Sequence, residues 1–338
     1  YSLMENGSTQ KLTTQNTETI EVAQQASAGM FAKNESGQAN GQSEVLSSGL
    51  IKMTGINSVG IIGKKSKITN SGTGAKGIEI SGAGSAGILA TDESEVINSG
   101  RIEGNTGASL VGISVDKNST ASNSGTITMK TTSNTGISST GGAVTNTGTI
   151  TLEKASSTGI SSENGNVTND SGATITAQEG SSVGIYSKLA GKDDVTVSNA
   201  GTISLSTASP VPSPAPEKSA AIYSLIDSGT GKLSTTNSGT IHVDQEASVG
   251  IYAENKGATR DNSDVTNSGL INVRKTSSAG MLGTKTKITN TGTGTTGGIL
   301  LTAVKTAGII ANAGSLVSNT GRIETSGVTP TVATDGLV

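Results

Sequence analysis

The sequence offers few candidate catalytic residues, because the residue types that usually perform catalysis are scarce and dispersed along it. The chain has no cysteine and one histidine, His242, which follows Ile241 and points outward if Ile241 faces a core. The densest acidic set is Asp193, Asp194, Glu217, Asp244 and Glu246, in segments that predict solvated loops. Cleavage of polysaccharides needs a close pair of carboxyl groups. No Ser-His-Asp order, phosphate loop or metal-ligand spacing occurs, so we predict no enzyme activity, catalytic residue, metal site or cofactor.

Tyrosine is the more informative residue type. Tyr186, Tyr223 and Tyr252 occupy one position in three consecutive repeats, each directly after an isoleucine. Between the first two lies a Pro-rich insertion, residues 207–218, which contains Pro210, Pro212, Pro214 and Pro216. Alternating prolines favour a stiff, extended loop. Insertions of this kind commonly carry the binding face of repeat proteins, and tyrosine offers a large contact area at low entropic cost. We therefore predict a partner-binding site at these seven residues.

A second interpretation of the tyrosines stays open. They could pack beneath the insertion and only anchor it, since the same position elsewhere holds Phe31, Ile62, Leu89, Leu282 and Ile310. A basic set is a weaker candidate for binding acidic ligands: Lys64, Lys65 and Lys67 match Lys285 and Lys287 in a longer duplication. The alternative is that these lysines lie on a solvated edge of the fold and have no binding role.

The elements that position these side chains follow from a repeat. A motif of the form V/I-x-N-S/T-G-x-I recurs along the chain. Its Asn lies at positions 98, 123, 146, 199, 237, 267 and 319, and weaker copies occur, such as the one at Ser47. A second motif, small-x-Gly-Ile/Met, follows each copy, as at Gly184 and Gly250. The shortest period is 23 residues, from Asn123 to Asn146. Such self-similarity predicts a solenoid.

Alternation within each motif predicts strands. Val144, Asn146, Ile150 and Leu152 share one parity and threonines take the other, which is the period of a strand with one buried face. We therefore predict an all-β, right-handed parallel β-helix of about 11–12 rungs, spanning residues 1–338 as one domain. The repeated Asn has two interpretations, a hydrogen-bonded ladder inside the coil or a residue that tolerates a turn.

Composition excludes several classes of protein. Aromatic residues make up 1% of the chain, too few for an ordinary globular core of 338 residues. A net charge of −3 gives no electrostatic footprint for nucleic acid. No apolar run reaches the length of a spanning helix. The chain opens Tyr1-Ser2-Leu3 without a leader, and we expect a mature fragment of a longer protein.

The N-S/T-G-x-I and S-x-G-I motifs, together with few aromatics and no Cys, resemble the passenger domains of type V autotransporters. They look most like the large fusobacterial outer-membrane adhesins of the RadD-like and galactose-binding types. The resemblance covers almost the whole chain. It implies a bacterial cell-surface location and attachment to the outer membrane through a C-terminal β-barrel that lies outside this chain. The family has no short ligand-binding motif whose residues could be matched to positions in this chain.

The resulting expectation is a monomeric, non-enzymatic adhesin fragment. The resemblance implies a host-cell receptor, a host glycan or a surface protein of another bacterium as partner. Two rivals remain, a passive stalk that presents a distal tip and a β-helix enzyme acting on surface polysaccharide.

Overall fold

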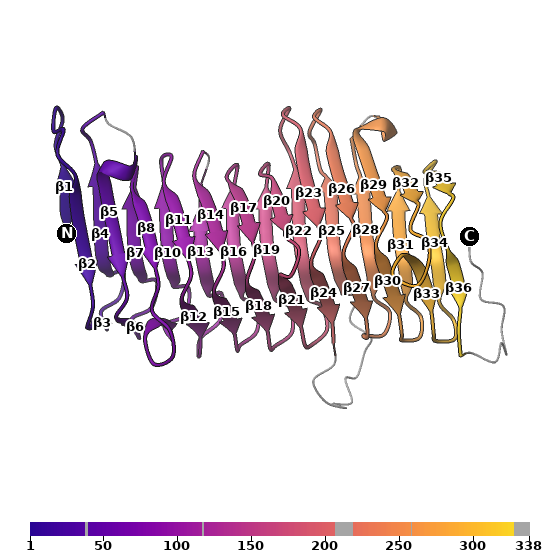
Figure 1. Ribbon diagram of the computed structural model, residues 1–338, viewed down its shortest axis with the longest axis horizontal. Helices are drawn as coiled ribbons and strands as arrows, with labels where there is room; N and C mark the ends of the chain where they lie inside the picture. The colour runs from indigo at the N-terminus through magenta and orange to yellow at the C-terminus, as the bar shows by residue number, and fades with distance from the viewer. Residues whose placement is uncertain (38–39, 117, 207–218, 258, 328–338) are drawn as a thin grey trace. The chain divides into compact units, whose positions relative to one another are not determined.

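The structure is a parallel β-solenoid (Figure 1). It is a computed structural model that describes residues 1–37, 40–116, 118–206, 219–257 and 259–327. The chain makes about 11 turns with a period of about 28 residues, and its strands form three parallel sheets with almost no helix. This confirms the predicted all-β solenoid. The chain divides into two compact units, Tyr1–Lys154 and Ala155–Val338, which are described separately below. The expectation of a single domain stays a prediction.

Each turn of unit 1 adds one strand to each of three sheets, here called A, B and C. Sheet A runs β1 (Ser2–Met4), β4 (Ala28–Asn34), β7 (Val59–Lys64), β10 (Ala86–Thr91), β13 (Val111–Val115) and β16 (Thr135–Thr140). Sheet B runs β2 (Leu12–Asn16), β5 (Ser43–Ser47), β8 (Lys67–Asn70), β11 (Glu95–Asn98), β14 (Thr120–Asn123) and β17 (Ala143–Asn146). Sheet C runs β3 (Thr19–Val22), β6 (Leu50–Met53), β9 (Gly77–Ile80), β12 (Arg101–Gly104), β15 (Thr126–Met129) and β18 (Thr149–Leu152). A short 3₁₀ turn, η1 (Asn40–Gln42), precedes β5.

Unit 2 repeats this arrangement. Its sheet A runs β19 (Thr158–Glu163), β22 (Val183–Leu189), β25 (Ala220–Ile226), β28 (Val249–Asn255), β31 (Ala279–Thr284) and β34 (Ala307–Asn312). Its sheet B runs β20 (Val167–Asn169), β23 (Val195–Asn199), β26 (Leu233–Asn237), β29 (Ser263–Asn267), β32 (Lys287–Asn290) and β35 (Leu316–Asn319). Its sheet C runs β21 (Thr174–Ala177), β24 (Thr202–Leu205), β27 (Thr240–Val243), β30 (Leu270–Val273), β33 (Gly298–Leu301) and β36 (Ile323–Thr325). A second 3₁₀ turn, η2 (Arg260–Asn262), precedes β29.

Alternation along the strands places the core inside the coil, as the sequence predicts. In β18 the side chains of Ile150 and Leu152 are buried, whereas Thr149 and Thr151 are partly exposed. Ile127 of β15 pairs in register with Ile150, so equivalent isoleucines stack from one turn to the next. The core is therefore a column of aliphatic side chains, each packed against its counterparts in the neighbouring turns.

The repeated Asn forms the predicted ladder. Each Asn is the last residue of its sheet B strand, and all are buried except the exposed Asn319; the Nδ2 of one Asn donates to the Oδ1 of the Asn one turn later, as from Asn98 to Asn123 and from Asn123 to Asn146. In unit 2 these hydrogen bonds run without interruption from Asn169 to Asn319, at 2.7–2.9 Å. The ladder satisfies buried amides that would otherwise be costly. The same Nδ2 atoms also reach a backbone carbonyl two residues on, as from Asn267 to Gly269 at 3.1 Å.

The glycine of the same motif is required by close approach of the backbone. At Gly125 an added Cβ would lie far inside van der Waals contact with the carbonyl oxygen of Gly100, the equivalent glycine one turn earlier. Gly148 meets Gly125 in the same way. The corner between sheets B and C can therefore turn this tightly only where no side chain is present.

Candidate functional site

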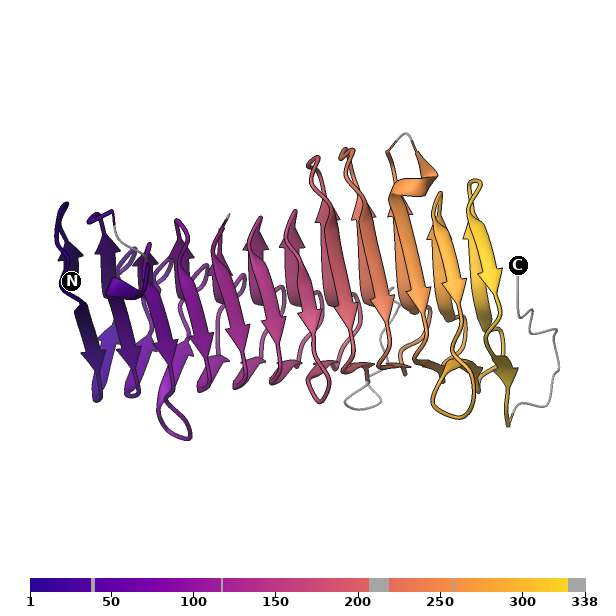
Figure 2. The same cartoon turned by 45° about the horizontal axis from the view of Figure 1, so that its top comes forward.

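The three tyrosines form one column on the outer face of sheet A in unit 2. Strands β22, β25 and β28 lie side by side (Figure 2, pink to orange), and Tyr186, Tyr223 and Tyr252 pair in register across them. The ring centroids of Tyr186 and Tyr223 are 5.3 Å apart, with an interplanar angle of 57°. Those of Tyr223 and Tyr252 are 4.7 Å apart and nearly parallel, at 11°. The sequence thus located the column correctly, and its role in binding stays a prediction.

Glu254 ties two of the tyrosines together. Its Oε2 accepts hydrogen bonds from the hydroxyls of Tyr223, at 2.8 Å, and Tyr252, at 3.3 Å. Burial raises the pKa of the Tyr186, Tyr223 and Tyr252 hydroxyls above the usual value for tyrosine, and for Tyr223 and Tyr252 the neighbouring Glu254 carboxylate raises the pKa further. Sequence reasoning missed Glu254. The only available signal was its parity, two residues after Tyr252 on the same face of the strand.

The column continues beyond the tyrosines. Leu282 pairs with Tyr252, Ile310 pairs with Leu282, and all five side chains are partly exposed. On the other side Tyr186 pairs with Ser161. In unit 1 the same column holds Phe31, Ile62 and Leu89 in register, and the ring of Tyr1 stacks on Phe31 at 5.0 Å. An outward apolar column on sheet A is therefore a feature of both units.

A chain of charged residues borders the tyrosines. Lys188 Nζ lies 3.7 Å from a carboxylate oxygen of Glu163 and 3.5 Å from one of Asp227. Lys256 Nζ lies 3.7 Å from the other carboxylate oxygen of Asp227. Glu163, followed by Asp227, raises the pKa of the Lys188 ammonium, which stays charged at neutral pH. These charges are paired with one another along the border of the column.

The four prolines of the predicted site, with Glu217, lie outside the described residues, within 207–218. The described residues on either side, Ser206 and Ser219, are hydrogen-bonded to neighbouring turns. The carbonyl of Ser206 accepts a 2.8 Å hydrogen bond from Nε2 of the buried Gln245, which also reaches the carbonyl of Ala177 at 3.1 Å. Ser219 is buried, and its hydroxyl accepts from the backbone N–H of Ser182 at 3.2 Å. Gln245 is a second residue that sequence reasoning missed.

The acidic residues and His242 do not converge. His242 lies on the outer face of β27, paired with Ser204 and Asn272. Burial, followed by the Arg274 guanidinium, lowers its pKa below the usual value for histidine. Asp244 instead forms a bidentate ion pair with Arg274, at 2.6 and 2.7 Å. In the described ranges no three His, Cys, Asp or Glu side chains gather as a metal site.

One carboxylate pair in unit 1 was not found from the sequence. Glu79 of β9 and Glu103 of β12 pair in register on the outer face of sheet C. Arg101 lies between them, 2.6 Å from an oxygen of Glu79 and in contact with Glu103, which also meets Lys130. Both carboxylates are thus engaged by cations rather than free to transfer protons.

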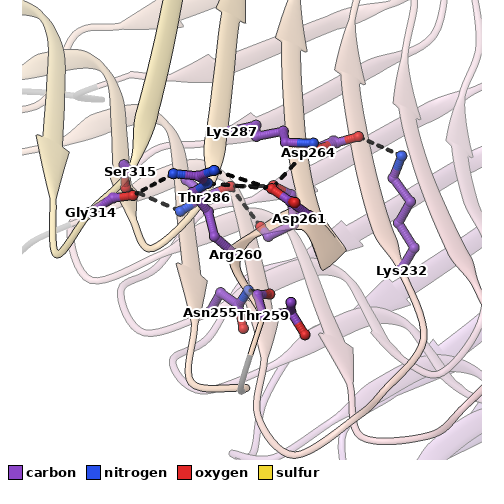
Figure 3. A network of polar contacts seen from close by, with 11 residues as sticks. Lys232, Asn255, Thr259, Arg260, Asp261, Asp264, Thr286, Lys287, Gly314 and Ser315 are labelled. Carbon is purple, nitrogen blue, oxygen red and sulfur yellow. Dashed lines mark hydrogen bonds and ion pairs between the residues drawn. The ribbon is translucent and has the colours of Figure 1, made fainter.

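The lysine candidates are also engaged. Lys287 Nζ lies 3.3 Å from Oδ1 of Asp261, which Arg260 approaches at 3.4 Å (Figure 3). Lys285 Nζ donates to the carbonyl of Gly257 at 2.7 Å. In unit 1, Lys64 pairs with Asp92 at 3.0 Å and Lys67 with Glu95 at 3.4 Å. Lys65 lies in the turn after β7. This pairing favours the solvated edge over a basic binding site.

Comparison with known proteins gives one family. The model of the BigA third pectate lyase-like domain matches residues 2–162 and 157–263, more than half of the chain. No curated protein and no solved structure matches. Within the described residues, no helix is long and apolar enough to cross a membrane. A parallel β-solenoid is the architecture expected of a pectate lyase-like domain, and the match extends over both units. The chain therefore belongs to the BigA third pectate lyase-like domain family.

Proposed function

We propose that this chain is a non-enzymatic adhesive segment of a bacterial surface protein, and that it binds its partner through the tyrosine column. The family is one of surface-protein domains, which supports the location. The resemblance to type V passengers supports a finer form of the proposal, an autotransporter adhesin anchored in the outer membrane. Its partner is then a host-cell receptor or glycan, or a surface protein of another bacterium.

The observation that carries the proposal is a contrast between two outer faces of the same turns. On sheet A the outward column holds Tyr186, Tyr223 and Tyr252. On sheet B the equivalent column of the same three turns holds Ser198, Thr236 and Thr266. Small polar residues suffice to cover an outer face of this solenoid, so three partly exposed tyrosines indicate a surface that meets another molecule.

A polysaccharide-cleaving enzyme is the second candidate. The pectate lyase-like description of the family supports it, whereas the ion pairs of Glu79 and Glu103 with Arg101 and Lys130 weigh against it. Its test is turnover of polygalacturonate, followed by absorbance of the unsaturated product, with E79Q and E103Q as variants. Turnover that either variant abolishes would replace the adhesin proposal.

The direct test is binding of the purified chain to intact epithelial cells and to a panel of bacteria. The triple variant Y186A/Y223A/Y252A removes the column, and S198A/T236A/T266A is its matched control on sheet B of the same turns. We expect at least a tenfold loss of binding for the first variant alone, with an unchanged melting temperature. Lost binding together with a large fall in melting temperature would assign the tyrosines to anchoring. If the wild-type chain binds none of these cells, the passive stalk is the function that remains.

A further inference from the structure

Resting on the proposed function, we propose that the occupant of this surface is an uncharged, apolar segment of a partner protein, laid along the solenoid axis. The surface is the apolar stripe, defined here as Tyr186, Tyr223, Tyr252, Leu282 and Ile310. The tyrosines form only part of it. The proposal therefore assigns a binding role to Leu282 and Ile310, which the sequence analysis associated with anchoring alone.

The first step concerns length. The five residues pair in register across β22, β25, β28, β31 and β34, and each is partly exposed. Four strand spacings make the stripe roughly 19 Å long. That is the length of a helix of about 13 residues or a strand of about six. A continuous apolar stripe of this length matches a segment of polypeptide rather than a single sugar ring.

The second step concerns the ring faces. Tyr223 and Tyr252 are stacked 4.7 Å apart and nearly parallel, so each ring covers one face of the other. Recognition of a sugar by stacking requires a free aromatic face. Rings stacked on each other and aliphatic side chains, in contrast, pack well against the apolar side chains of a protein.

The third step concerns charge. The hydroxyls of Tyr223 and Tyr252 are already bound by Glu254. The bordering charges of Glu163, Lys188, Asp227 and Lys256 are paired with one another. A stripe that offers no unpaired charge, and whose Tyr223 and Tyr252 hydroxyls are already bound, complements an uncharged partner, because a charged one would lose its hydration without gaining an opposite charge.

Together these features have the composition of a protein–protein interface. An aromatic and aliphatic centre lies beside a border of paired charges that stays in contact with water. Tyrosine and leucine anchors at the centre then carry most of the binding energy, and the border contributes little.

The experiment places charges at the far end of the stripe, away from the tyrosines. Variants L282K and I310K are compared with T266K and T289K, which put the same charge on outward positions of sheet B. The probe is the cell type that wild-type chain binds, used intact, after surface digestion with trypsin, and after oxidation of its glycans with periodate. Melting temperatures and the milder variant L282S separate lost binding from lost folding.

We expect L282K and I310K to bind at least tenfold more weakly than T266K and T289K at similar melting temperatures, and L282S to lose binding in part. Trypsin should abolish binding of the wild-type chain. Any other combination overturns the proposal. In particular, unchanged binding by L282K and L282S alongside lost binding by Y186A/Y223A/Y252A would refute the protein segment and leave the proposed adhesin function standing. Unchanged binding by the triple Tyr variant would refute the proposed function itself.

Discussion

Asn123 donates a 2.7 Å hydrogen bond from its Nδ2 to the Oδ1 of Asn146, the equivalent residue one turn later. The same bond links Asn98 to Asn123 at 2.6 Å and Asn70 to Asn98 at 2.7 Å. In unit 1 the ladder is interrupted once, at Ser47. There the Nδ2 of Asn16 meets the Ser47 hydroxyl at 3.4 Å and the Leu50 carbonyl at 3.5 Å instead of an Asn side chain, and the buried Oδ1 of Asn70 has no hydrogen-bond partner.

The interruption predicts a stabilising substitution. Ser47→Asn places a donor beside Oδ1 of Asn70 and an acceptor beside Nδ2 of Asn16, at a buried site whose counterparts in other turns hold Asn. We expect the free energy of unfolding to rise by about 1 kcal/mol, measured by urea denaturation. Ser122→Asn, on the outer face of the same sheet, is the control and should change stability little. A destabilised S47N chain would show that the ladder contributes no net stability.

Charge inside the coil should be far more damaging than charge outside it. Ile127 is fully buried between Ile102 and Ile150, whereas its neighbour Thr126 is exposed. Ile127→Asp should lower the free energy of unfolding by on the order of 4 kcal/mol, because it buries an unpaired carboxylate. Thr126→Asp should stay within about 0.5 kcal/mol of wild type. Equal shifts in thermal denaturation would contradict the observed orientation of β15.

Two glycines of unit 1 should respond differently to alanine. At Gly125 a Cβ meets the backbone of the preceding turn, and at Gly74 it meets nothing within 4 Å but the φ angle is +62°. Gly74→Ala should therefore cost only about 1–2 kcal/mol, the strain of a left-handed residue. Gly125→Ala must displace the stacked corner and should cost clearly more. Similar unfolding midpoints for the two variants would argue against close approach as the reason for the motif glycine.

Alkaline pH should destabilise the chain through the tyrosine column. The folded-state pKa values of Tyr186, Tyr223 and Tyr252 are raised, so the unfolded chain loses these protons first. Stability is thus fully present below the unfolded value of about 10 and falls as pH rises above it. Tyr223→Phe should flatten the decline between about pH 10 and 11.5, followed by urea denaturation. An unchanged slope, or normal ionisation of these tyrosines at 295 nm, would refute the coupling.

The repeat by itself determined most of the fold. The parity of Val144, Asn146, Ile150 and Leu152 gave the buried face, and the spacing of equivalent residues gave the register. The tyrosine column followed from the same register, because equivalent positions in a solenoid must stack. Ser47 was also recognisable as a weaker copy, and it occupies the Asn position of its turn.

Tertiary structure alone decided how the side chains interact between turns. Glu254 binds Tyr223 from 31 residues away, and Gln245 reaches Ala177 from 68 residues away. Insertions of different length separate these pairs in sequence, so no fixed spacing reports them. The partners of Lys188 and Lys287 are likewise set by which flexible side chains meet across neighbouring turns. Backbone hydrogen bonding fixes the register that a repeat encodes, whereas the outer surface depends on rotamers and turn lengths that vary from one turn to the next.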